Sequence, residues 1–461
     1  MEWRPLVLAA LCSSAAACGS DPAGDESGRP DSWHVRSGFV RDADGRAIIL
    51  RGANLANQHK QAPYLGFHQP ADFQDLRQVW GMNAIRYLLT WAAVEPQDGQ
   101  FDDAYLEAVA QRMDWAHEAG LLVVLDMHQD VYGEGFGGDG APKWTCDQAH
   151  YEAYEPQSPW FLNYLNEHVA ACFDHLWTSE ELGRRFAEAW AHVAARLGDH
   201  PAVVGFDVLN EPHWGTAIPG SFERERLQPF YERVVRAVRV QAPSWVAFLE
   251  PSAGRNVGIA TSLTSFPFSN VAYAPHSYDA SAEQGNGFNP VSRGAILANY
   301  ESLAEEARSL DAALWIGEYG GIADDEGIVA YMDAQYDGAA AVAAGTMYWS
   351  YDRDNGYGML RPEGAEKVVL LDVLVRPYPE RVAGRPLFWS FDEESRTFVL
   401  RFEPDRSITA PTVLSVPSRV YPNGYEVECD GCEHASDGMV LWVTKSPEGS
   451  PAEIVVRPGG R

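Results

Sequence analysis

The sequence predicts an α/β protein: a (β/α)8 TIM barrel followed by a C-terminal all-β sandwich domain. Between residues 47 and 352, eight short apolar runs of strand type alternate with amphipathic stretches of helical spacing, which is the element order of such a barrel. After about Val375 only short alternating segments separated by turn residues remain. A doubly wound sheet is the alternative, but no GxGxxG or P-loop motif follows a strand. We therefore expect the barrel at 33–375 and the sandwich at 376–461.

The individual segments support this assignment in chain order. The predicted barrel strands are AIILRGANL from Ala47, MNAIRYLL from Met82, LLVVLDMH from Leu121, VVGFDVLNE from Val203, WVAFLEP from Trp245, VAYAPHSY from Val271, ALWIGEYG from Ala313 and GTMYWSYD from Gly345. Stretches such as DAYLEAVAQRMDWAHEAG from Asp103 end at Gly or Pro, as helices do. The tail contains TFVLRF, TVLSV, YEVEC, MVLWVTK and EIVVR, and we expect it to pack against the barrel.

The first residues have the pattern of an export signal. MEWRPLVLAALCSSAAACGSD combines a basic residue, a short apolar core and small residues before Cys18. We expect a signal peptide of lipoprotein type at 1–17, with Cys18 lipidated, although Leu is missing three residues before the Cys. Plain secretion, with cleavage near the same point, is the alternative. Residues 18–32 are polar and read as a tether.

The composition narrows the classes of function. With 46% hydrophobic and 22% charged residues, the chain has the content of an ordinary globular protein. Its formal net charge of −30 argues against nucleic acid and anionic membrane surfaces as partners. No later run is long enough to span a bilayer.

Four cysteines remain after Cys18, and an oxidising compartment favours two disulfides among them. The simplest pairing joins neighbours, Cys146 with Cys172 and Cys429 with Cys432. The CDGC motif at 429–432 is also compatible with a redox or zinc half-site. No second CxxC or His pair accompanies it, so we expect no metal.

Polar side chains gather at the predicted strand ends, where barrel enzymes carry their active sites. Glu211 and Glu318 end the fourth and seventh strands and can face each other across the barrel mouth. Two facing carboxyl groups cleave glycosidic bonds, one as proton donor and the other as nucleophile. An ionised Glu318 would favour the protonated form of Glu211, and Arg86 would keep Glu318 ionised.

Several of these motifs resemble glycoside hydrolase family 5, from about Trp33 to Pro377. NEP at 210–212 and GEYG at 317–320 are similar to its acid/base and nucleophile motifs, and NAIR, DMHQD, HSY and the strand-eight Trp match in the same order. The resemblance implies a retaining β-glycosidase with Glu211 as acid/base and Glu318 as nucleophile. It also implies a substrate site formed by Arg86, His128, Asn210, His276, Tyr278 and Trp349.

NQHKQAPY, LDMHQDVYGEGFGGDGAPKW and the sandwich tail are similar to the endoglycoceramidase branch, whose members cut the β-glucosidic link between an oligosaccharide and ceramide. This likeness implies sugar contacts by Lys60 and Asp130. In the long segment 131–201, aromatic side chains either line an acyl-chain groove or form the core of an elaborated loop. They include Trp144, Trp160 and Trp177.

The sequence thus predicts a retaining β-glycosidase that hydrolyses glycosphingolipids and is secreted or lipid-anchored in a bacterial cell envelope. We expect no cofactor and no protein partner, only a glycolipid or oligosaccharide substrate and membrane attachment through Cys18 if it is lipidated. One alternative is a family 5 β-glucosidase or endoglucanase on other β-glucosides or polysaccharides. A second, of another class, is a non-catalytic carbohydrate-binding surface lipoprotein, which the intact Glu211 and Glu318 oppose.

Overall fold

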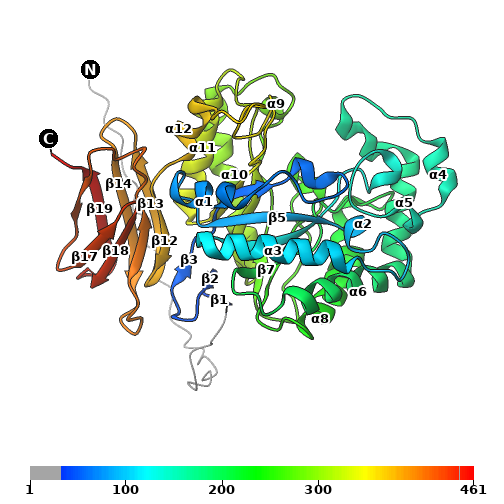
Figure 1. Ribbon diagram of the computed structural model, residues 1–461, viewed down its shortest axis with the longest axis horizontal. Helices are drawn as coiled ribbons and strands as arrows, with labels where there is room; N and C mark the ends of the chain where they lie inside the picture. The colour runs from blue at the N-terminus through cyan, green and yellow to red at the C-terminus, as the bar shows by residue number, and fades with distance from the viewer. Residues whose placement is uncertain (1–32, 446, 461) are drawn as a thin grey trace, which may run out of the picture.

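The computed structural model describes residues 33–445 and 447–460, and its centre is a closed barrel of parallel strands (Figure 1). Each of the eight predicted runs supplies one barrel strand, so the predicted barrel is confirmed. In barrel order the strands are β4 (Arg51–Leu55), β5 (Ala84–Thr90), β6 (Leu122–His128), β7 (Val203–Asp207), β8 (Val246–Leu249), β9 (Val271–Tyr273), β10 (Ala313–Tyr319) and β11 (Gly345–Tyr348).

Helices surround the barrel, and local capping signals set their ends. In α3 (Asp103–Ala119) the Asp102 carboxylate accepts the Tyr105 N–H, and Gly120 ends the helix with φ at 78°. The other α-helices are α1 (Pro70–Gln78), α2 (Trp91–Val94), α4 (Gln148–Ala153), α5 (Glu167–Thr178), α6 (Glu180–Leu197), α7 (Pro219–Phe222), α8 (Gln228–Arg239), α9 (Ala280–Glu283), α10 (Arg293–Ser309), α11 (Ile328–Val342) and α12 (Val368–Leu374).

Short helical turns occupy the loops between these elements. The 3-10 turns are η1 (Asn57–Lys60), η2 (Glu134–Phe136), η3 (Lys143–Thr145), η4 (Trp160–Leu165), η6 (Ala253–Val257) and η7 (Pro290–Ser292), and η5 (Glu223–Leu227) is a π-helical turn. Most of them follow the carboxyl ends of barrel strands, where they form one rim of the barrel.

The run from Ala47 was predicted to be one strand, and that prediction is wrong. Its first part is β3 (Ala47–Ile48), which pairs with β12 (Tyr378–Val382) of the C-terminal part, and only its second part enters the barrel as β4. The strands β1 (His34–Arg36) and β2 (Phe39–Arg41) join the same C-terminal sheet. A strand in either sheet needs the same apolar residues, so local sequence does not distinguish them.

The C-terminal part is the predicted sandwich, with its two sheets at one end of the molecule (Figure 1). One sheet has the order β1-β2-β3-β12-β15-β18-β17 and the other β13-β14-β19-β16. The remaining strands are β13 (Gly384–Asp392), β14 (Thr397–Pro404), β15 (Thr412–Ser415), β16 (Tyr425–Glu428), β17 (Glu433–Asp437), β18 (Val440–Lys445) and β19 (Ala452–Pro458).

The sandwich packs against the barrel, as predicted. Tyr336 and Ala340 of α11 share an apolar cluster with Trp389 of the sandwich, and Arg77 of α1 forms an ion pair with Glu380 of β12 at 2.6 Å. Both contacts bury side chains between the two domains, so the tail extends the barrel's core.

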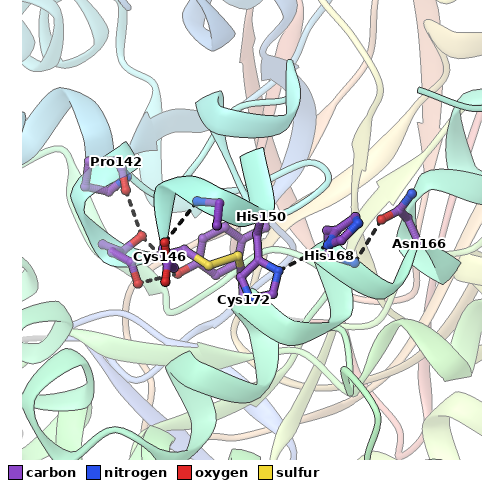
Figure 2. Close-up of a disulfide and its surroundings, with 10 residues drawn as sticks. Pro142, Cys146, His150, Asn166, His168 and Cys172 are labelled. Carbon is purple, nitrogen blue, oxygen red and sulfur yellow. Dashed lines mark hydrogen bonds between the residues drawn. A yellow bond between two sulfur atoms is a disulfide. The ribbon is translucent and has the colours of Figure 1, made fainter. Parts of the chain in front are cut away.

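Both predicted disulfides form. Cys146–Cys172 ties the loop after η3 to α5 (Figure 2), and Cys429–Cys432 closes the turn between β16 and β17. The predicted signal peptide, Cys18 and the tether lie outside the described residues. Within 33–445 and 447–460, each helix is too short or too polar to pass through a bilayer.

Candidate active site

The carboxyl ends of the barrel strands surround a cavity of about 290 Å³. Most of the predicted site residues line it: Lys60, His128, Asp130, Asn210, Glu211, Tyr278, Glu318 and Trp349. The other two, Arg86 and His276, are buried directly beneath and contact these residues. The barrel therefore brings together all the site residues predicted from the strand ends.

Glu211 and Glu318 face each other across this cavity. One carboxylate oxygen from each, together with a ring nitrogen of His276, forms a group whose atoms all lie within 4.8 Å of one another. A separation of about 5 to 5.5 Å between two carboxyl groups is the spacing of retaining glycosidases. The pair is therefore placed for nucleophilic attack by one carboxylate and not for activation of an intervening water.

The backbone of Glu211 adopts an unusual conformation. Its φ is +41°, in the left-handed region that residues with a Cβ rarely occupy and that costs about 1 to 3 kcal/mol where it is forced. The Glu211 N–H donates to Glu250 Oε2 at 2.7 Å, which holds this conformation. The strain directs the Glu211 side chain into the cavity.

Arg86 connects the buried groups below the cavity floor. Its guanidinium donates to Glu318 Oε1 at 2.6 Å and to Asn210 Oδ1 at 2.9 Å. Three further carboxylates surround it at 2.9 to 3.0 Å: Asp126, Asp207 and Glu250. Because these anions stabilise the guanidinium more than burial destabilises it, the pKa of Arg86 is raised well above its usual value.

The prediction from sequence missed Asp126, Asp207 and Glu250. The signal that would have found them is present, since each is an acid within or directly after an otherwise apolar strand. A carboxylate in such a position is buried and needs a cationic partner. Only the folded barrel identifies that partner as Arg86.

The expected contact of Arg86 with Glu318 is present, and burial acts against it on the same carboxyl group. Burial raises the pKa of Glu318, and the nearby Glu211 adds to this, while His276 and Arg86 oppose it. Tyr278 also donates its hydroxyl to Glu318 Oε2 at 3.0 Å. Arg86 and Tyr278 thus favour the carboxylate, and burial, the larger influence, opposes it.

His276 links the carboxyl groups. Its Nδ1 lies 2.8 Å from Glu211 Oε1 and 3.5 Å from Glu318 Oε2, and its Nε2 lies 3.2 Å from Glu250 Oε1. Burial opposes a charged ring, yet these carboxylates raise the pKa of His276 well above its usual value. The raised pKa favours the protonated ring, which donates from Nδ1 to Glu211 Oε1.

One wall of the cavity contains the residues expected to contact sugar. The Lys60 ammonium forms an ion pair with Asp130 and lies 4.5 Å from the ring centre of Trp349. The His128 ring stacks on Trp349 with ring centres 5.3 Å apart, and its Nδ1–H donates to Asp126 Oδ2 at 2.8 Å. This wall offers an aromatic face beside charged groups, a combination that suits a sugar ring and its hydroxyls.

The aromatic residues of segment 131–201 were expected either to line an acyl-chain groove or to form the core of a loop, and the structure places them at different positions. Trp144 packs on Trp91, with ring centres 5.4 Å apart, and Trp177 donates to the His213 carbonyl at 2.8 Å, so both belong to the core of the elaborated loop. Trp160 is instead 51% exposed and lines the cavity. Phe161 and Leu165 on the same turn, η4, are also exposed.

Three acidic groups have the ligand types and spacing of a metal site, but cations of the protein already occupy them. Arg86 fills the group formed by Asp126, Asp207 and Glu250. Lys60 pairs with Asp130 in the group of His128, Asp130 and Asp139. A metal ion would have to displace a cationic side chain at these two groups. The third group includes His276 itself, whose raised pKa favours the protonated ring, and a protonated ring does not coordinate a metal ion.

The cavity also contains three residues that the sequence did not single out as site residues. Asn57, Glu283 and Tyr357 line it from the loops after β4, β9 and β11. Burial raises the pKa of Glu283 to about 7, and Glu211 and Glu318 add to this effect. Polar residues are common in loops, so only the tertiary structure distinguishes these three.

Two family models match the chain. Cellulase (glycosyl hydrolase family 5) matches residues 41–355, and the glycoside hydrolase family 5 C-terminal domain matches residues 376–456. Together they cover the barrel and the sandwich described above.

Individual relatives give the same result. The chain is 28% identical over 459 residues to endoglycoceramidase I of Rhodococcus hoagii (strain 103S), covering 93% of this chain and 88% of that protein. It is 33% identical to endo-glycoceramidase II from Rhodococcus sp. in its ganglioside GM3 complex, covering 92% of this chain and 99% of that one, with a TM-score of 0.85. The lactosyl-enzyme intermediate of the same enzyme is also 33% identical, covering 92% and 100%, with a TM-score of 0.83.

Proposed function

The chain belongs to glycoside hydrolase family 5, and we propose that it is a retaining endoglycoceramidase-type enzyme that hydrolyses the β-glucosidic bond between glycan and ceramide. The observation that carries this proposal is the location of the Glu211–Glu318 pair in a polar cavity whose edge includes the exposed apolar turn η4. The similarity to two Rhodococcus endoglycoceramidases supports the same substrate class.

The reaction proceeds in two steps at these carboxyl groups. Glu318 attacks the anomeric carbon and forms a glycosyl ester, while Glu211 gives its proton to the departing ceramide oxygen. A water then attacks the anomeric carbon of this ester and gives its proton to Glu211, and Glu318 leaves as a carboxylate. The anomeric configuration is retained because each step inverts it.

Neighbouring groups prepare each carboxyl group for its role. Arg86 and Tyr278 hydrogen-bond Glu318 and stabilise the carboxylate that leaves in the second step. Asn210 is held by Arg86 and by the Gln129 carbonyl at 3.2 Å, which orients its amide at the cavity surface for the sugar 2-hydroxyl. Lys60, His128, Asp130 and Trp349 contact the glycan from the opposite wall.

Ceramide requires an apolar surface beside the scissile bond. Trp160, Phe161 and Leu165 on η4 are 51%, 36% and 69% exposed, and large apolar side chains that gather on a surface mark binding sites more often than isolated ones do. A soluble polysaccharide gives no reason for such an edge, so this segment favours a lipid glycoside over a cellulose-like chain.

Mass spectrometry of the products from lactosylceramide, gangliosides, glucosylceramide, galactosylceramide and cello-oligosaccharides tests the proposal. Intact oligosaccharide with free ceramide, absent with Glu318→Gln, is the expected result. Glucose released from glucosylceramide alone would indicate an exo-acting β-glucosidase. Cleavage of cello-oligosaccharides alone would indicate an endoglucanase, and glycan binding without turnover would indicate a binding lipoprotein.

We also propose that Cys18 anchors the enzyme to the cell envelope. The net charge of −30 opposes adsorption to an anionic membrane, so a covalent lipid would supply the proximity to glycolipid that charge does not. The mass of the mature N-terminus, compared between the native chain and Cys18→Ser, distinguishes an anchored protein from a secreted one.

A further inference from the structure

Asn256 lies in η6, the short turn that follows barrel strand β8. Its side chain is exposed, and its amide Nδ2 donates to Glu211 Oε1 at 2.6 Å. Nothing in the sequence pattern singles it out, because it follows Arg255 in a loop rather than ending a strand. The contact places a neutral donor directly on the acid/base.

Two donors converge on the same oxygen of Glu211. His276 Nδ1 reaches Oε1 at 2.8 Å and Asn256 Nδ2 reaches it at 2.6 Å. Among residues 33–445 and 447–460, no side chain donates a hydrogen bond to Oε2. The two oxygens of this carboxyl group are therefore in different environments.

This asymmetry determines where a proton resides. An oxygen that already accepts two hydrogen bonds from N–H donors has no lone pair facing free space, and a proton there would meet both donors. The Oε2 oxygen has neither obstacle. In the protonated acid, Oε1 is the acceptor-type oxygen and Oε2 carries the hydrogen.

We propose that Asn256 is a positioning residue which, with His276, holds Oε1 of Glu211 and so reserves Oε2 for proton transfer in both steps. The inference rests on the proposed role of Glu211 as acid/base. Oε2 gives its proton to the departing oxygen in the first step and takes one from water in the second. A single oxygen therefore performs both transfers, and the carboxyl group does not rotate between them.

Asn256→Ala, with the neighbouring Val257→Ala as matched control, is tested on chromogenic aryl β-glycosides whose phenols differ in acidity. We expect kcat/KM to fall about tenfold for the poorest leaving group and to stay within twofold for the best, because only the former needs an oriented acid.

Asn256→Gln retains an amide donor and should recover most of the lost rate. Val257→Ala should match the parent, because Val257 is 76% exposed and its side chain has no hydrogen-bond donor for Glu211. Equal losses for good and poor leaving groups, or no recovery of rate in Asn256→Gln, would overturn the proposal. These aryl substrates report the acid/base chemistry alone, so failure to cleave glycolipids would contradict the proposed substrate and leave this test independent.

Discussion

Replacing Lys60 by Met should destabilise the fold by about 3 kcal/mol, because it leaves the Asp130 carboxylate without its partner. The Lys60 and Asp130 side chains are each only 19% exposed. Removing one member of a fully buried pair costs about 3 to 5 kcal/mol, and partial exposure places this pair at the lower end. The cation–π contact of Lys60 with Trp349 is worth about 0.5 to 1 kcal/mol of the total.

A double-mutant cycle isolates this pair. Guanidinium unfolding of the parent, Lys60→Met, Asp130→Asn and the double variant should give a coupling energy of about 2 kcal/mol. Lys60→Arg keeps the charge and is the control for side-chain packing. Additive effects of the two single changes would refute the assignment of the pair as a stabilising contact.

The pH dependence provides a second check on the same pair. Burial opposes the Asp130 carboxylate, but Lys60 and His128 outweigh burial and lower the pKa of Asp130. A group with a depressed folded-state pKa contributes stability above its unfolded value of about 3.9 and loses it only as pH falls through the folded value. The coupling should therefore persist at pH 4, and its loss there would contradict the stated electrostatics.

Three further changes test other parts of the structure. Glu211→Gln should slow cleavage of ceramide glycosides by about 100-fold or more. It should spare formation of the glycosyl ester from aryl glycosides with the most acidic phenols, which pre-steady-state bursts would measure. Equal loss for both kinds of substrate would contradict the role of Glu211 as acid. Cys146→Ser should lower the unfolding free energy by about 3.5 kcal/mol, from the 26-residue separation of the disulfide; an unchanged denaturation midpoint under oxidising conditions would contradict this. Trp160→Ser should reduce kcat/KM for glycolipids about fivefold or more, because burying this side chain against lipid is worth about 1 kcal/mol or more. The kcat/KM for soluble aryl glycosides should stay within twofold of the parent. Parallel losses for both kinds of substrate would place Trp160 in the glycan site instead.

Much of the fold and site could be predicted from sequence because the signals are local. Strand and helix periods set the eight-strand count, and strand ends in a barrel all meet at one rim, so Glu211 and Glu318 could be paired without coordinates. The NEP and GEYG motifs contain Glu211 and Glu318 at the ends of predicted strands, where a barrel enzyme carries its active site.

The remainder depended on contacts between distant segments. The run from Ala47 was predicted as one strand, but its first residues form β3 in the C-terminal sheet. The sequence could not reveal this pairing because the partner strand β12 lies over 300 residues away. Glu250 was missed because it acts by accepting hydrogen bonds from the Glu211 N–H and from Arg86, and both of these residues are remote from it in the sequence.

The sequence by itself determined which residues do the chemistry, since residue type and place on a strand decide what a side chain can donate or accept. Only the tertiary structure decided the pKa values and the hydrogen bonds of these residues. The burial that raises the pKa of Glu318 and the three carboxylates that raise the pKa of His276 arise from packing across the barrel. The two donors on one oxygen of Glu211 come from the loops after β8 and β9, which the fold places side by side.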